Sequence, residues 1–268
     1  MKLSPKFFTV EKDGPVVIWK YNNPPSNLRT MESDAEYVQL ISEFEADPEL
    51  RAGIFTSALP DVFIQHYDVA TLVKWSELIK AAPENKITLP DPPTYRTGPK
   101  VIIAAINASL AGGGLELVME CDFRFMSRTA YAAQPEVIVG ILASGGGTQR
   151  MPRLIGLDKA LDLQLTGRPI SADEAFRIGL VTRVSEPDKL LPDAIAFAKI
   201  IASRPPLAVA NIRKAMYEGL NMSLKEGLKL EWQLQMQLFA SDDAQRLMKQ
   251  YVAGGQNAEL MRRELPPI

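Results

Sequence analysis

Apolar and polar positions along the first part of the chain predict alternating strands and helices. Two β-rich runs, Phe7–Glu11 and Val16–Tyr21, flank Asp13-Gly14, a dipeptide typical of tight turns, and so predict a β-hairpin. From about Thr30 to Ala46, apolar residues recur at helical spacing, which predicts a helix with one buried face. The run Ala52–Ser57 predicts the next strand. The chain therefore begins with β-structure and continues as an α/β pattern.

The middle of the chain is organised around a glycine-rich junction. The apolar run Val101–Ala104 predicts a buried strand, and the mostly apolar segment Leu115–Cys121 predicts a buried helix. Between them stands Gly112-Gly113-Gly114, where a ligand atom can approach the backbone closely. The first N–H groups of a helix are unpaired and carry positive potential. The junction predicts tight packing, a phosphate loop or an oxyanion site, and it matches neither GxGxxG nor the P-loop pattern.

An acidic residue follows these glycines immediately. Glu116 falls in the first turn of the predicted buried helix, and burial of an acid is costly unless it has a partner or a chemical role. A second glycine-rich helix start, Gly145-Gly146-Gly147, follows a strand predicted at Phe123–Met126 and the apolar run Val137–Leu142. Two such helix starts indicate a functional site more strongly than either one alone.

The remaining segments are a proline-rich connection and a helical end. Residues 82–99 cannot form a continuous helix, so they form either a surface connection or a flap over a ligand channel. Ser171–Glu174 and Ser223–Glu226 predict helix-starting capping boxes. From about Pro205 the chain is wholly helical, and its last helix should stop at Gly254-Gly255. These helices carry more apolar surface than they can bury alone, so we expect them to pack on the core or on a neighbouring subunit.

Length and composition limit the classes of protein. A chain of 268 residues accommodates one large core and an appendage, which we place at residues 1–200 and 201–268. The net charge of −2 without a basic block argues against a nucleic-acid partner. The single cysteine, Cys121, excludes an internal disulfide, and the single histidine, His66, excludes a multi-histidine metal site. Without a signal-like or membrane-spanning apolar run, we expect a cytoplasmic protein with no membrane partner.

Three motifs occur in order along the chain. The first is Ile103–Leu117 with its three glycines. The second combines Gln134-Pro135-Glu136 with Gly145–Gly156, and the third lies within Leu165–Val181. Over about Phe8 to Tyr251 they resemble the crotonase, or enoyl-CoA hydratase/isomerase, superfamily. The resemblance implies a crotonase-like spiral of ββα repeats with a C-terminal helical trimerisation region. It also implies an acyl-CoA thioester substrate, no cofactor beyond that coenzyme A, and a homotrimer or dimer of trimers.

The resemblance also assigns site residues. The family's two oxyanion-hole N–H groups correspond to those of Gly113 and Tyr67, and the two glutamates that hold a water in its hydratases correspond to Glu116 and Glu136. Isomerases of the family usually keep only the later acid. Because both glutamates are present, the resemblance favours an enoyl-CoA hydratase that adds water across the 2,3-double bond of a 2-enoyl-CoA.

Glu136 also has a structural alternative. It could form a salt bridge with Arg124 or Arg150 and would then be ionised. If instead it shares a water with Glu116, the two carboxyl groups should titrate as a coupled pair with one protonated near neutral pH.

Departures from the family pattern keep other functions open. His66 and Tyr67 replace small residues in the oxyanion loop, and Ser144 stands where hydratases often have glycine. His66 is either structural or a catalytic or substrate-contacting group. The alternatives are an isomerase, a C–C bond or thioester hydrolase that uses His66, and a non-catalytic acyl-CoA-binding trimer.

Overall fold

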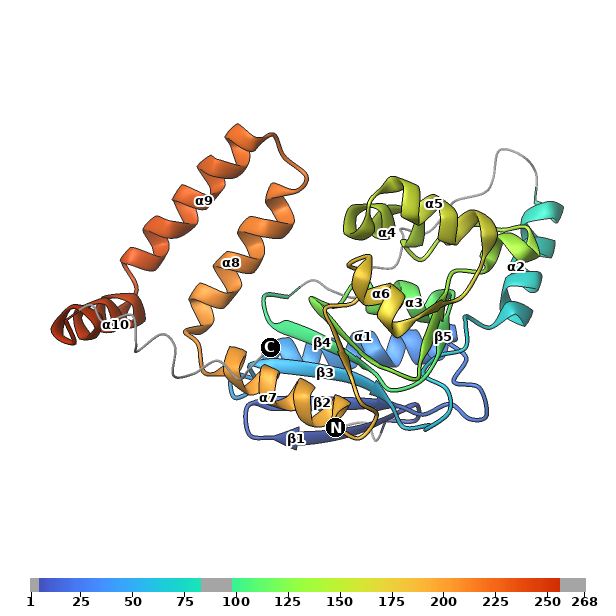
Figure 1. Cartoon of the computed structure of the whole chain (residues 1–268), viewed down its shortest axis with the longest axis horizontal. Helices are drawn as coiled ribbons and strands as arrows, with labels where there is room; N and C mark the ends of the chain where they lie inside the picture. Colours follow the sequence, from blue (N-terminus) through green and yellow to red (C-terminus); the bar gives the residue numbers. More distant parts are fainter. Residues whose placement is uncertain (1–4, 83–97, 256–268) are drawn as a thin grey trace.

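The computed structural model describes residues 5–82 and 98–255 and contains two mixed β-sheets with helices around them (Figure 1). The larger sheet has the strand order β1-β2-β3-β4-β6-β9, and the smaller has the order β5-β7-β8. In the larger sheet only the β1–β2 pair is antiparallel, and in the smaller only β7–β8. The strands are β1 (Phe8–Asp13), β2 (Val16–Tyr21), β3 (Ala52–Ser57), β4 (Val101–Ile106), β5 (Leu110–Ala111), β6 (Phe123–Ser127), β7 (Tyr131–Ala133), β8 (Ile170–Ser171) and β9 (Arg183–Ser185).

Helices follow the strands and close each turn of the chain. They are α1 (Met31–Ala46), α2 (Val69–Ala81), α3 (Gly113–Val118), the 3-10 helix η1 (Glu136–Val139), α4 (Gly147–Ile155), α5 (Leu157–Thr166), α6 (Ala172–Arg177), α7 (Leu190–Ala202), α8 (Pro206–Gly219), α9 (Leu224–Phe239) and α10 (Asp242–Ala253). From β4 to β5 to α3, and again from β6 to β7 to α4, one strand enters the large sheet, the next enters the small sheet, and a helix returns. This is the expected spiral of ββα repeats.

The N-terminal elements confirm the hydrophobic pattern. The hairpin of β1 and β2 turns at Gly14, whose φ of +58° suits glycine. Thr30 caps α1 by accepting from the Ser33 N–H. The apolar residues of α1 that face the core, as their spacing predicts, are Tyr37, Leu40, Ile41 and Phe44.

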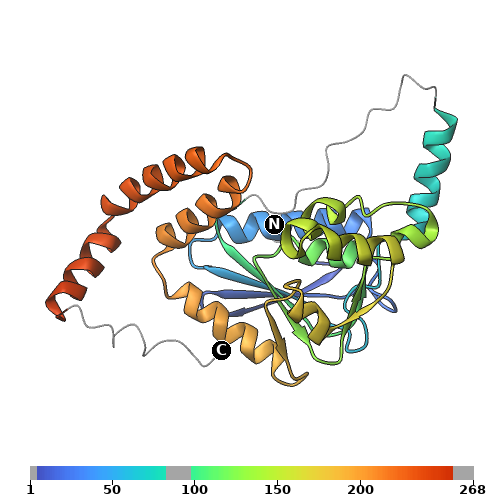
Figure 2. The same cartoon turned by 45° about the horizontal axis from the view of Figure 1, so that its top comes forward.

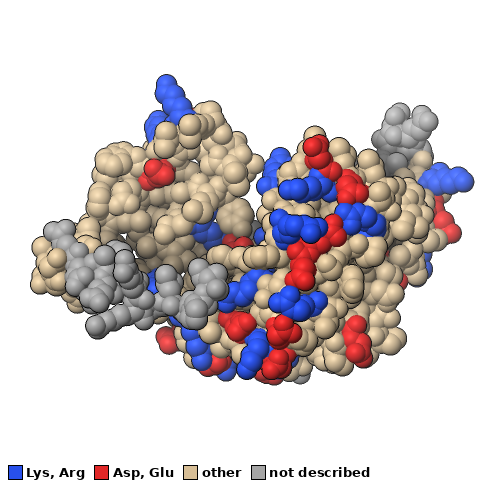
Figure 3. Space-filling model, viewed as in Figure 1, with Lys and Arg blue, Asp and Glu red and all other residues tan. Residues whose placement is uncertain are grey.

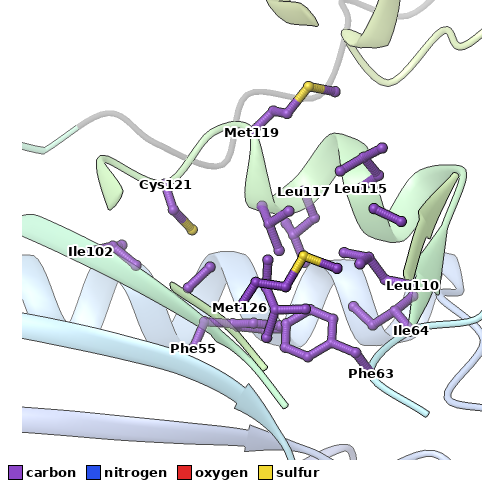
Figure 4. Packing of buried hydrophobic residues seen from close by; sticks show 14 of the residues in the cluster. Phe55, Phe63, Ile64, Ile102, Leu110, Leu115, Leu117, Met119, Cys121 and Met126 are labelled. Carbon is purple, nitrogen blue, oxygen red and sulfur yellow. The ribbon is translucent and has the colours of Figure 1, made fainter. Parts of the chain in front are cut away.

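The large sheet is buried on both faces. Alternate residues of a strand point to opposite sides, so Ile54 and Ile103 pack against α7, which contributes Ala194 and Ala198. The opposite face meets α1 and α3. Figure 4 shows the buried apolar residues on this face around α3, with Leu117 of α3 beside Met126 of β6. Since α3 is packed against the sheet, the glycine junction at its start is held in a fixed place.

Two local predictions were wrong. The helix after the glycines ends at Val118 instead of continuing to Cys121, because the chain turns back to the sheet, where the Asp122 N–H donates to the Ile102 carbonyl at 2.9 Å. At Ser171 only half of the capping box forms. Its hydroxyl accepts from the Glu174 N–H, but the Glu174 carboxylate is bound by Arg168. The proline-rich connection falls almost wholly in residues 83–97, outside the described residues.

The C-terminal helices extend from one side of the core (Figures 1 and 2). The Arg213 guanidinium of α8 donates to Asp122 at 2.7 Å and to the Gly98 carbonyl at 2.7 Å, and so ties α8 to the core. The capping box at Ser223 and the end of α10 before Gly254 confirm their predictions. The boundary near residue 200 stays a prediction. Within the described residues, no single helix is long and apolar enough to cross a membrane, although α7 and α8, bent by 104°, meet the length and composition criteria as a pair.

Candidate active site

The glycine junction brings two backbone donors close together. Gly112 has a φ of +51°, and a Cβ atom there would lie 3.0 Å from a Glu136 oxygen, so both conformation and space require glycine. A Cβ atom on Gly113 would lie 3.3 Å from the Tyr67 nitrogen. Within the described parts of the chain, neither the Gly113 nor the Tyr67 N–H donates a hydrogen bond. The two N–H groups that the resemblance assigns to an oxyanion hole therefore lie side by side and uncommitted.

Glu116 is buried against the second glycine loop. Its Oε1 accepts from the Gly147 N–H at 2.8 Å, and a Cβ atom on Gly145 would lie 2.6 Å from its Oε2. Side chains at these positions would displace the carboxyl group, which explains the second glycine-rich helix start. The pKa of Glu116 is raised to about 7, chiefly by burial and in part by the nearby Glu136, while the Gly147 N–H opposes the rise. The carboxyl group can thus exchange a proton near neutral pH.

Glu136 lies in the same site, at the start of η1. Its Oε1 accepts from the Gln134 side-chain amide at 2.8 Å, and its buried Oε2 has no hydrogen-bond partner among the residues that the structure describes. Burial raises the pKa of Glu136, and the Gln134 and His66 side chains partly oppose this. A Cβ atom on Gly147 would touch both the Glu116 carboxyl, at 3.0 Å, and the Gln134 amide, at 3.4 Å. Glu116 and Gln134, the residue that binds Glu136, therefore lie beside the same glycine.

The structural alternative for Glu136 is wrong. Arg124 donates to the carbonyl groups of Leu180 and Cys121 inside the core. Arg150 forms an ion pair with Glu120 at 2.6 Å instead. With neither arginine bound to it, Glu136 keeps an oxygen available for a ligand.

His66 and Ser144 occupy different surroundings. The His66 Nδ1 lies 2.7 Å from the Tyr67 carbonyl oxygen, which can only accept, so Nδ1 carries the hydrogen and Nε2 is the acceptor of the neutral ring. The His66 Cβ lies 3.5 Å from the Cβ position of Gly112, which places the residue beside the junction. Ser144 is exposed and directly precedes Gly145. The structure thus brings His66 to the site and leaves Ser144 at its edge.

Two contributions were not predicted from the sequence. Gln134 connects Glu136 to the glycine loop, although the motif alone indicates no role for it. Arg150 donates to the Gly145 carbonyl at 2.7 Å while it binds Glu120, so it fixes the loop that holds Glu116. The ion pair between Arg150 and Glu120, 30 positions apart, has no local sequence signal.

An apolar cavity of about 250 Å³ opens beside Glu136. Its polar lining consists of Gln134, Glu136, Thr148 and Gln164. Its apolar lining comes from η1, the segment that follows it, α4 and α5, and includes Val137, Ile141, Leu142, Leu157, Leu161 and Leu165. This shape suits an apolar group attached to a polar reacting centre.

The raised pKa of Glu116 makes stability depend on pH. The folded chain binds this proton up to about pH 7, whereas the unfolded chain releases it near 4.5, so the Glu116 contribution to stability falls as pH rises between these values. We expect Glu116→Gln to raise the free energy of unfolding by about 1–3 kcal/mol at pH 8 and by much less at pH 5. Urea unfolding at both pH values measures this, with the exposed Glu49→Gln as control. An equal effect at both pH values would contradict it.

Comparisons with known proteins agree with one another. A family model described as enoyl-CoA hydratase/isomerase matches residues 11–257. A short-chain-enoyl-CoA hydratase from Clostridium acetobutylicum is 34% identical over 248 residues, which cover 91% of this chain and 93% of that protein. An (E)-benzylidenesuccinyl-CoA hydratase from Thauera aromatica is 35% identical over 223 residues, which cover 82% of this chain and 86% of that protein. A crystal structure of an enoyl-CoA hydratase from Geobacillus kaustophilus superposes with a TM-score of 0.81 at 29% identity, over 94% and 96% of the two chains.

Proposed function

Because the chain belongs to the enoyl-CoA hydratase/isomerase family, whose substrates are acyl-CoA thioesters, we propose that it adds water across the 2,3-double bond of a 2-enoyl-CoA. The observation that carries the proposal is the pair of acids, the buried Glu116 and the half-buried Glu136, both with a raised pKa, beside two uncommitted N–H groups. Two proton-exchanging acids suit a reaction that moves one proton from water and delivers another to carbon.

In the proposed reaction the thioester oxygen accepts hydrogen bonds from the Gly113 and Tyr67 N–H groups. Water bonds to C3 as Glu116, in its ionised form, takes one of its protons, and the electron pair of the double bond moves to form the enolate. Glu136, in its protonated form, then donates its proton to C2, which gives the 3-hydroxyacyl thioester. The enolate charge develops on the oxygen that the two N–H groups face, and such donors contribute strongly to rate in a dry site.

The cavity beside Glu136 can hold part of the acyl group. Glu136, which the proposed mechanism sets next to C2, lines the cavity together with mostly apolar residues. We therefore assign it to the apolar part of the acyl group.

The test is a panel of enoyl-CoA substrates, from short to long and aromatic, followed by loss of the enoyl thioester absorbance and mass spectrometry of products. The proposal expects a product heavier by one water. A CoA-dependent product of another kind would favour the isomerase or hydrolase alternatives. Acyl-CoA binding by calorimetry without turnover of any substrate would favour the non-catalytic binding protein.

One observation favours the alternative that uses His66. Its Nδ1 binds the Tyr67 carbonyl, which leaves Nε2 for another group, and its Cβ lies 3.5 Å from the Cβ position of Gly112 at the junction. A neutral imidazole in this position can accept a proton from water or from substrate. In that case His66, and not Glu116, would be the base.

Assembly as a homotrimer or dimer of trimers is part of the proposal. The C-terminal helices show few charged residues in Figure 3, and they expose large apolar side chains, among them Leu224, Leu228 and Trp232 of α9. Neighbouring exposed apolar side chains of this kind are typical of an interface.

We expect light scattering to give three or six times the chain mass of 29.6 kDa. Trp232→Glu, which places a charge on the exposed face of α9, should lower that mass, whereas Lys229→Glu on the same helix should not. A monomer mass for the unmodified chain would refute the assembly.

A further inference from the structure

Arg29 is a buried arginine that neither the mechanism nor the motifs include. Only 4% of its surface is exposed. Its guanidinium binds both carboxylate oxygens of Asp34, at 3.0 Å each, in the bidentate geometry typical of this pair. A third bond, of 2.5 Å, runs from its Nη1 to the Gly113 carbonyl oxygen, 84 positions away along the chain. The side chain thus connects the start of α1 to the glycine junction.

The backbone of Arg29 holds the other donor segment. Its N–H donates to the His66 carbonyl at 3.0 Å, and its carbonyl accepts from the Asp68 N–H at 2.8 Å. This is parallel bridging across Tyr67. Because the neighbours of Tyr67 make both bonds, the N–H and carbonyl of Tyr67 itself point away from the Arg29 backbone. The guanidinium carbon also lies 5.9 Å from the centre of the Tyr67 ring.

One residue therefore contacts both segments that supply the oxyanion donors. The Cβ position of Gly113 lies 3.3 Å from the Tyr67 nitrogen and 3.6 Å from the Arg29 Nη1, so the three groups meet at one point. The Ala111 N–H, which donates to the Ile64 carbonyl at 3.1 Å, joins the same two segments a few residues earlier in each, and Arg29 adds the contacts at Gly113 and around Tyr67 themselves.

We propose that Arg29 is a positioning residue that sets the distance and direction of the Gly113 and Tyr67 N–H groups and so pre-forms the oxyanion hole. This rests on the proposed function insofar as the hole serves a thioester. Asp34 fixes the guanidinium plane and largely balances its charge, so geometry, and not the positive charge alone, is what Arg29 contributes. Misplacement of donors by about 1 Å typically costs on the order of 10²-fold in rate.

The direct readout is the enolate of a bound 3-ketoacyl thioester. Acetoacetyl-CoA ionises at C2 when a site stabilises the charge on its thioester oxygen, and the enolate absorbs in the near ultraviolet. We expect Arg29→Met to lower the bound enolate-to-keto ratio about 10- to 100-fold and kcat to a similar extent. The Kd of butyryl-CoA, which forms little enolate, should change less than about threefold because the site still binds coenzyme A.

Three further variants distinguish geometry from charge and from general damage. Arg29→Lys keeps the charge but lacks the planar guanidinium, so its bound enolate-to-keto ratio should fall nearly as far as that of Arg29→Met. Asp34→Asn weakens the bidentate bond to the guanidinium without removing the arginine, so it should lower the enolate-to-keto ratio to an intermediate value. It also tests the proposal if Arg29→Met does not fold. The exposed Arg128→Met, which removes an arginine that pairs with Asp173 and Glu186, should match the unmodified chain.

Each outcome decides the proposal. A full enolate signal in Arg29→Met, or in Arg29→Lys and Asp34→Asn together, would overturn it. If the unmodified chain forms the enolate but hydrates no substrate on the panel, the proposed hydratase activity is refuted. The enolate ratios of the Arg29 and Asp34 variants still decide whether Arg29 positions the oxyanion hole. If the unmodified chain binds acetoacetyl-CoA without forming the enolate, there is no oxyanion hole to position, and the proposal is refuted.

Discussion

Replacing Glu116 by Gln should lower kcat for hydration about 10²–10⁴-fold and leave KM for the enoyl-CoA nearly unchanged. The amide has the size of the carboxyl group and can still accept from the Gly147 N–H, so the loop that packs on it should keep its place. What the amide lacks is the ability to take a proton from water. Stopped-flow or steady-state loss of enoyl absorbance across pH 5–9 measures the change.

Glu136→Gln provides the matched comparison. It removes the other proton-exchanging acid, so it should cause a loss of the same order, and the double variant should lose much less than the product of the two because the acids act as a unit. His66→Ala should cost less than either. A larger loss for His66→Ala than for Glu116→Gln would show that His66 is the base and would favour the alternative reaction.

The second large effect should come from removing one oxyanion donor without removing a side chain. Gly113→Pro deletes the N–H at the first position of α3, where proline is tolerated in a helix. We expect kcat/KM to fall about 10²–10³-fold, the typical cost of losing one donor. The same absorbance assay measures it, with circular dichroism to establish that the fold is kept.

Gly113→Ala separates the donor from the added bulk. It keeps the N–H but places a Cβ atom 3.2 Å from the Tyr67 Cβ, slightly closer than usual. We expect a loss of less than about tenfold, because a shift of a few tenths of an ångström relieves this contact. If alanine costs as much as proline, crowding and not the missing donor explains the loss, and the assignment of the Gly113 N–H is wrong.

Patterns that are local in the sequence predicted the fold well. The spacing of apolar residues gave the bounds of α1 within one residue, and turn and cap residues gave the hairpin and the ends of the last helices. The failures came from contacts with residues outside the local motif. The helix after the glycines stops early because the Asp122 N–H donates to the Ile102 carbonyl. The Glu174 carboxylate does not complete the capping box at Ser171 because Arg168 binds it.

For the site, the sequence predicted residue types better than their connections. The resemblance supplied Glu116, Glu136, Gly113 and Tyr67, and the structure brings them together, while their chemical roles stay predictions. Arg29 was missed because nothing in its neighbourhood distinguishes a buried arginine from an exposed one. The sequence also did not show which apolar residues are exposed. Ile138 belongs to an apolar run, yet 70% of its surface is exposed, and periodicity cannot tell a core residue from one that faces a partner.

The cavity beside Glu136 has a consequence for how this protein can diversify. Its apolar walls come from one continuous stretch, residues 137–165, whereas the proton-exchanging Glu116 and the amide donors come from elsewhere in the chain. Substitutions of the apolar side chains in that stretch, but not of Gly145, Gly147 or Arg150, which hold Glu116 in place, can reshape the space for a longer, branched or aromatic tail without disturbing the proposed catalytic groups. If the cavity holds the acyl tail, as proposed, substrate range can change through these side chains while the proposed catalytic groups stay as they are.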